Sequence, residues 1–217
     1  MKHTRITLQR LALTSLAGFC LAGALSACAP VMIGSAVVGT LVAVDRRTSG
    51  AQLEDEGIEL RAAARVRDNL GDRAHINITS YNRQVLLTGE VPTAQDKQLV
   101  EKIVSQVENV RVITNELGVM GNTSLSQRSS DALVTGRVKA ALVDARDLYA
   151  SAFKVLTERG TTYLMGRVTQ READRATEVA RSSSGVQKVV RLFEIISEEE
   201  LQRLLPQPAE PAPAPKK

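Results

Sequence analysis

The chain of 217 residues has few of the side chains on which most enzymes depend. It contains no Trp, two Cys and two His, and aromatic residues make up 3% of it. Nucleophilic, acid–base and metal chemistry draw largely on Cys, His and clustered carboxylates. No pair of catalytic carboxylates, no H-E-x-x-H and no G-x-S-x-G motif stands out. We therefore expect no catalytic residue and no metal site, and we interpret His75 as a surface or strand-edge residue.

The first 28 residues have the pattern of an export signal. Three basic residues, Lys2, Arg5 and Arg10, precede an apolar run over 11–25, and the tetrad LSAC ends at Cys28. This tetrad resembles the lipobox of bacterial lipoproteins, which implies that residues 1–27 are removed and that Cys28 carries diacylglycerol and an N-acyl chain. The alternatives are an ordinary signal with a chance cysteine, or an uncleaved anchor helix. We expect no cofactor apart from the covalent lipid, and no disulfide, because Cys20 leaves with the signal.

The remaining chain contains an internal repeat. Residues 85–91 (VLLTGEV) match residues 162–168 (TYLMGRV) at an offset of 77. A repeated pattern indicates a repeated structural unit. We predict a lipidated linker at 28–52, a first domain at 53–120, a linker at 121–129, a second domain at 130–196, and a short helix with a Pro-rich tail at 197–217.

Each repeat predicts the order helix, strand, strand, helix, strand. Ile58, Ala62, Val66 and Leu70 recur at helical spacing, and residues 76–79 alternate as a half-buried strand does. Thr169-Gln170-Arg171-Glu172 forms a complete capping box at the start of a helix. The fold class is α+β, with a small three-stranded mixed sheet packed on two helices in each domain. Because each unit has only about 65 residues, we expect the two units to pack together.

A glycine interrupts one strand in each repeat. Gly89 and Gly166 occupy equivalent positions, and glycine inside a strand indicates a bulge or a close approach of backbone. We interpret both as structural residues, at a bulge or at a close contact between helix and sheet.

Taken together, the chain resembles the dual BON-domain outer-membrane lipoproteins, the family of the division- and outer-membrane stress-associated lipoprotein. The resemblance implies an αββαβ fold for each domain, no enzymatic activity, and a role in outer-membrane integrity. It also implies that the first helix of the second domain binds anionic phospholipid. Related proteins can place a tryptophan near the start of that helix, where this chain has Leu133. The resemblance is carried by the lipobox, Val38-Gly39-Thr40, Ile58-Glu59-Leu60-Arg61, residues 85–89, residues 163–166 with Val168-Thr169, and Gly185-Val186.

The charges of the two repeats agree with that expectation. Residues 53–119 have eight basic and eleven acidic side chains, a net of −3, whereas residues 128–196 have twelve and eight, a net of +4. An anionic membrane attracts the second domain and repels the first. The alternatives are that the charges only solubilise the domains and that Leu133 packs on its own helix start. The predicted binding residues for phosphatidylglycerol or cardiolipin are Leu133, Arg137, Lys139, Arg146, Leu148 and Tyr149.

The residue after the lipobox bears on localisation. In lipoproteins of this kind an Asp at that position favours the inner membrane, so Ala29 agrees with the periplasmic face of the outer membrane. The alternative function is an anchored scaffold that binds an envelope protein through a strand edge or the acidic first domain. Nucleic acid is disfavoured as a partner, because the chain has few aromatic residues and no long basic run.

Overall fold

The computed structural model describes residues 45–204. The predicted signal, Cys28, Ala29 and the Pro-rich tail lie outside the described residues. Within 45–204, no helix combines the length and hydropathy that a membrane span requires.

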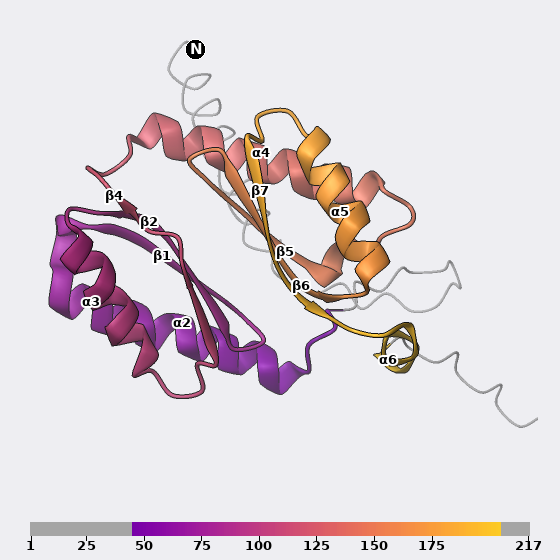
Figure 1. The fold of residues 1–217 in the computed structure, drawn as a ribbon, viewed down its shortest axis with the longest axis horizontal. Coiled ribbons are helices and arrows are strands. Elements are labelled where there is room, and N and C mark those ends of the chain that lie inside the picture. Colours follow the sequence, from indigo (N-terminus) through magenta and orange to yellow (C-terminus); the bar gives the residue numbers. More distant parts are fainter. Residues whose placement is uncertain (1–44, 205–217) are drawn as a thin grey trace, which may run out of the picture. The chain divides into compact units, whose positions relative to one another are not determined.

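The first domain has the expected order of elements. In chain order they are α2 (Ser49–Leu70), the short 3₁₀ helix η2 (Gly71–Arg73), β1 (His75–Tyr81), β2 (Gln84–Val91), α3 (Ala94–Ser105), β3 (Val112–Asn115) and β4 (Gly118–Val119). Strand β2 pairs antiparallel with β1 and parallel with both β3 and β4. Figure 1 shows α2 and α3 together on one face of this sheet. The single closing strand expected over 110–119 is divided, because Leu117 between β3 and β4 turns into the core, so this sheet has four strands.

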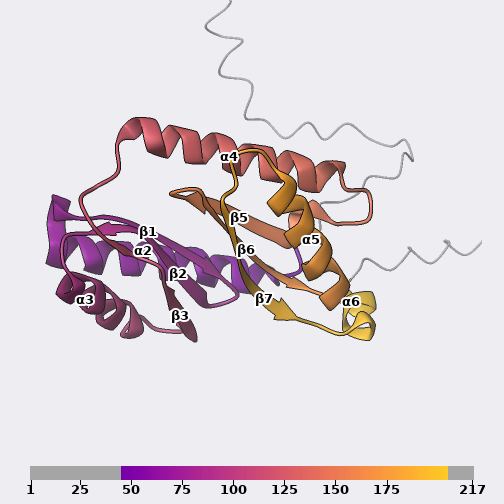
Figure 2. The ribbon, with the colours of Figure 1, turned by 45° about the horizontal axis from the view of Figure 1, so that its top comes forward.

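The second domain repeats this arrangement with three strands. Its elements are α4 (Leu125–Asp144), η3 (Ala150–Ala152), β5 (Phe153–Glu158), β6 (Thr161–Val168), α5 (Gln170–Ser182) and β7 (Lys188–Ile195), followed by α6 (Glu198–Leu204). Strand β6 lies between antiparallel β5 and parallel β7. In Figure 2, α4 and α5 lie on the same face of the sheet. The predicted α+β class and the αββαβ order are confirmed in both domains.

The predicted apolar stripes form the two cores. All four residues of the first stripe, from Ile58 to Leu70, are at most 5% exposed. Helical spacing in the next predicted helix indicates a second buried stripe, formed by Leu99, Val100, Ile103, Val104 and Val107. Val100 and Val104 of this stripe are fully buried in α3, but the prediction for Leu99 was wrong, since it is 37% exposed. The predicted capping box is present: Thr169 accepts from the backbone N–H of Glu172, whose carboxylate accepts from the N–H of Thr169.

A buried aspartate in each first helix fixes the hairpin turn of its domain. Both turns have positive φ at their two central residues, Asn82 and Arg83 in the first domain, and Arg159 and Gly160 in the second. The carboxylate of Asp55 accepts the N–H groups of the first pair, and that of Asp131 accepts those of the second. The two aspartates are 76 positions apart and are 2% and 4% exposed. Their role was not predicted from the sequence, because their separation is one less than the offset of 77 that relates the two strands.

The two strand glycines are needed for a close approach, but the neighbour is a strand and not a helix. A Cβ on Gly89 would lie 2.1 Å from the carbonyl oxygen of His75, and one on Gly166 would lie 2.5 Å from that of Ala152. Gly89 also has a φ of +107°. The expected contact with a helix was therefore wrong, because the space is taken by backbone at the start of the neighbouring strand.

The central strands β2 and β6 are buried on both faces. Val85 and Leu87 point into the first core and Leu164 points into the second. The opposite faces meet in a separate apolar cluster that joins the two domains and consists of Tyr81, Leu86, Tyr163 and Met165. Removal of the tyrosines from water raises their pKa values, to about 12 for Tyr163.

Candidate functional site

Helix α4 carries most of the residues predicted to bind lipid. Its N-cap is Ser124, whose hydroxyl accepts the backbone N–H of Gln127 at 3.2 Å. One side of the helix packs into the second core through Val134, Val138 and Leu142, each at most 4% exposed. The side opposite these residues is therefore fixed as a surface of the domain.

That opposite side carries mainly apolar and small side chains, with the exposed Asp144 at its edge. Leu133 is 63% exposed and Val143 is 69% exposed. At about 100° per residue, positions 133, 136, 140 and 143 fall within an arc of about 80°. Gly136 and Ala140 complete the arc with small side chains. We define the α4 surface as these four residues together with two cations beside them, Arg137 and Lys139.

The two cations are exposed and carry no acidic partner. Neither forms a salt bridge with any of residues 45–204. Arg137 Nη1 makes one long hydrogen bond, 3.4 Å, to the carbonyl oxygen of Ser184. Lys139 lines a cleft of about 410 Å³ between α4, β5 and β1, together with Arg128. Both charges are thus available to an anion outside the protein.

The other three predicted residues lie beyond the end of α4. Arg146 is exposed in the turn that follows the helix. Tyr149 is 39% exposed, and the guanidinium of Arg46 lies 5.9 Å from its ring centroid. The prediction for Leu148 was wrong: it is 9% exposed and belongs to the second core, because the chain turns back toward the sheet here. Leu148 is therefore not part of the candidate surface.

The segment that precedes α2 docks on both domains, which the sequence analysis did not predict. Arg46 forms a bidentate pair with Glu172 of α5, with both distances 2.7 Å and both side chains 1% exposed. Arg47 binds Asp55 at 2.7 Å and lies 4.3 Å from the centroid of the Tyr81 ring. Of these two adjacent linker residues, Arg46 thus binds the second domain and Arg47 binds the first.

The Arg46 contact changes the chemistry of the capping box. Burial alone raises the pKa of Glu172, but hydrogen bonds from Arg46 and from the backbone of Thr169 outweigh it and hold this pKa below its usual value. Glu172 is therefore a charged group inside the protein. It depends on a cation 126 positions away in the sequence.

Comparisons with known proteins agree with this architecture. The BON domain family matches residues 55–121 and 130–197, beside the predicted 53–120 and 130–196. The chain is 37% identical over 175 residues to the outer membrane lipoprotein DolP of Haemophilus influenzae, which covers 79% of this chain and 90% of that protein. It is 34% identical over 155 residues to the 21 kDa hemolysin of Actinobacillus pleuropneumoniae, covering 70% and 80% of the two chains.

A more distant relative has the same kind of similarity. The osmotically-inducible protein Y of Escherichia coli is 29% identical over 146 residues, covering 64% of this chain and 72% of that protein. The two matched domains account for more than half of the chain, and the relative from Haemophilus influenzae is matched along most of its length. The chain therefore belongs to the family of outer-membrane lipoproteins with two BON domains.

Proposed function

We propose that this protein is a non-enzymatic, lipid-anchored periplasmic protein whose second domain binds anionic phospholipid and thereby supports outer-membrane integrity. The observation that carries the proposal is the α4 surface, an exposed apolar arc with two cations that have no acidic partner among the described residues. Phosphatidylglycerol and cardiolipin are the anionic lipids that we expect this surface to bind.

Two contributions favour binding of the α4 surface to such a membrane. Leu133 and Val143 gain by leaving water for the boundary between headgroups and acyl chains. Arg137 and Lys139 contribute on the order of 1 kcal/mol each when held near an anionic surface. Because the helix has Leu133 where an aromatic residue would anchor more firmly, binding by this surface alone is weak and depends on salt.

The predicted lipid on Cys28 makes weak binding sufficient. A protein already tethered to the bilayer meets the headgroups at a high effective concentration. The second contact then selects anionic regions of the membrane and orients the domain. The similarity to a protein named as an outer membrane lipoprotein supports the same location for this chain.

The proposal is tested with the chain from Ala29 to Lys217, which lacks the lipid. We expect it to co-sediment with phosphatidylglycerol vesicles at low salt, less at physiological salt, and not with purely zwitterionic vesicles. If it binds neither kind of vesicle, Cys28 is the only membrane contact and the proposal is wrong.

A specific feature of the first domain favours the scaffold as a second candidate. Leu53 and Leu60 are 69% and 72% exposed and lie two turns apart on the outer side of α2. This domain also has a net charge of −3. If a protein partner is the ligand, substitutions on α2 abolish function in cells while substitutions on α4 do not.

A further inference from the structure

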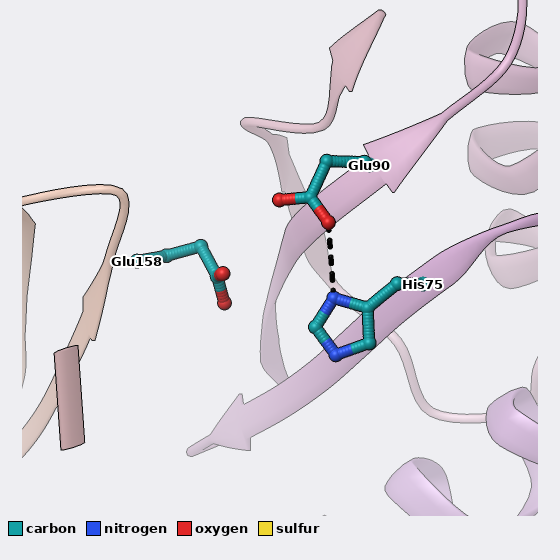
Figure 3. Close-up of side chains that lie close together, drawn as sticks. All are labelled: His75, Glu90 and Glu158. Carbon is teal, nitrogen blue, oxygen red and sulfur yellow. Dashed lines mark hydrogen bonds and ion pairs between the residues drawn. The ribbon is translucent and has the colours of Figure 1, made fainter. Parts of the chain in front are cut away.

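Three titratable side chains from distant parts of the chain meet between the two sheets. His75 begins β1, Glu90 lies near the end of β2, and Glu158 ends β5 of the second domain. Each of them offers one ligand atom, and these atoms all lie within 4.8 Å of one another. Figure 3 shows the Glu158 carboxylate directed from the second sheet toward the other two side chains. The lipid proposal uses none of these residues.

Glu90 is the buried and charged member of the cluster. Its side chain is 0% exposed, and its two oxygens have different partners. Oε1 accepts from Arg159 at 2.8 Å, whereas Oε2 accepts from Thr123 and lies 3.1 Å from His75 Nδ1. Burial raises its pKa, but hydrogen bonds from Arg159, Thr123 and His75 outweigh burial and lower it. Glu90 is thus a carboxylate held in place, with one oxygen facing the imidazole.

Glu158 is equally enclosed but has no cation. It is 4% exposed, its Oε2 accepts one hydrogen bond from Asn77 at 2.9 Å, and no salt bridge joins it to any residue of 45–204. Burial in this position, next to the charge of Glu90, raises its pKa. A buried carboxylate without a counter-charge is costly, so it takes up either a proton or a cation.

The third residue of the cluster, His75, offers a nitrogen ligand and is partly open to solvent. The side chain of His75 is 21% exposed. His75, Asn77 and Glu158 line the cleft of about 410 Å³ that also contains Lys139. An ion can therefore enter from solvent, and water in the cleft can complete its coordination.

We propose that His75, Glu90 and Glu158 form a binding site for a divalent transition metal ion, with Zn²⁺ as the favoured ion. One imidazole nitrogen and two carboxylate oxygens are the donor types that Zn²⁺ takes, whereas Ca²⁺ and Mg²⁺ prefer oxygen alone. Donor atoms around tetrahedral Zn²⁺ lie about 3.3 Å apart at its usual bond lengths. The ligand atoms now lie within 4.8 Å of one another, so binding of the ion would draw them closer together. Glu158, with a single hydrogen bond, would move most, because Arg159 and Thr123 hold Glu90.

The charges of the neighbouring groups are compatible with this ion. Arg159 donates to Oε1 of Glu90 and Thr123 donates to Oε2, so an ion bound to Oε2 would take the place of the contact between Oε2 and His75 Nδ1. The two ligand carboxylates and the guanidinium of Arg159 carry a net charge of −1, which a divalent cation offsets, and the cleft beside them also contains Arg128, Lys139 and Asp131.

The bound ion would join the two domains. Two of its ligands come from the first sheet and one from the second. It would therefore stabilise their contact in addition to the apolar cluster around Tyr81 and Tyr163. This proposal departs from the expectation of no metal, which considered His75 without the two glutamates that the fold places beside it.

The experiment titrates the metal-free, full-length lipidated chain in detergent with Zn²⁺ and measures binding by calorimetry and the melting temperature. We expect one Zn²⁺ per chain and a higher melting temperature. We expect His75→Ala and Glu158→Gln each to weaken Zn²⁺ binding by about tenfold or more. Glu108→Gln, at an exposed position remote from the cluster, serves as the matched control and should bind as the unaltered chain does.

A spectroscopic probe keeps the test independent of stability. Co²⁺ in place of Zn²⁺ gives visible absorption bands whose intensity reports a four-coordinate site with a nitrogen donor, and His75→Ala should remove them. Glu158→Gln keeps an acceptor for Asn77, so we expect it to fold without metal. The proposal is overturned if the unaltered chain binds no Zn²⁺, if the two variants bind as the control does, or if Ca²⁺ and Mg²⁺ bind as tightly as Zn²⁺.

Discussion

Helices α2 and α4 open the two domains and bury equivalent side chains. At an offset of 76, each presents a carboxylate to the hairpin turn, followed by three or four apolar residues that fill the core. The outer sides of the two helices differ. On α2, the positions that correspond to the α4 arc at the offset of 76 include the charged Arg67, and Arg61 beside them is paired with Glu54 at 2.7 Å. On α4, the corresponding arc is uncharged, and Arg137 and Lys139 beside it have no such pair.

This difference shows which positions the fold constrains. The turn requires a carboxylate and the core requires apolar side chains, and both helices supply them at their inward positions. The outward positions carry no such requirement. One copy of the domain is therefore free to become a membrane surface while the other remains acidic.

The largest effect is expected at Arg46, the linker cation that is buried against the second domain. Arg46→Ala leaves the Glu172 carboxylate buried without its partner, which costs about 3–5 kcal/mol of unfolding free energy. Urea unfolding of the purified protein measures this loss. The exposed Arg203→Ala serves as a control and should change stability little. An equal, small effect of both substitutions would show that residues 45–47 do not hold the domains.

The next prediction concerns the two buried aspartates. Asp131→Ala leaves two N–H groups of its turn without an acceptor, at a cost of about 1–3 kcal/mol. Asp55→Ala should cost about 1–2 kcal/mol more, because Asp55 also binds the Ser80 hydroxyl and Arg47. The same urea measurement ranks the pair, and the reverse order would contradict the account of the turns.

The contribution of Asp55 to the free energy of unfolding should also depend on pH. Burial raises the pKa of Asp55, but hydrogen bonds from Ser80, Arg83 and Arg47 outweigh it and lower the pKa in the folded protein. A lowered folded-state pKa gives stability that is complete above the unfolded value, about 3.9, and is lost as the pH falls through the folded value. The stability difference between the unaltered protein and Asp55→Asn should therefore shrink below about pH 4. A difference that stays constant on acidification would be evidence against this role.

Local patterns in the sequence predicted the helices and strands and part of the candidate site. The capping box at Thr169, the stripe from Ile58 to Leu70 and the exposed position of Leu133 all follow from spacing within one helix or its start. Leu148 could not be placed in this way, because its burial depends on the path of the chain after α4.

Such local patterns could not predict the contacts made between distant parts of the chain. Arg46 and Glu172 are 126 positions apart, and His75 and Glu158 come from different repeats, so no motif spacing connects them. The two aspartates are an intermediate case: the repeat that contains them was recognised, but the turns that they bind were not.

The central claim is that α4, and not α2, binds the membrane. The direct measurement is co-sedimentation of chains 29–217 with phosphatidylglycerol vesicles, comparing Leu133→Glu/Arg137→Glu/Lys139→Glu with the matched control Leu60→Glu/Arg65→Glu/Arg67→Glu. All six side chains are exposed, and both sets change the net charge equally. At about 1 kcal/mol per cation, the α4 set should weaken binding by about 30-fold or more, and the α2 set should change it little. Equal weakening by both sets would show that only net charge matters and would contradict the assignment of the surface.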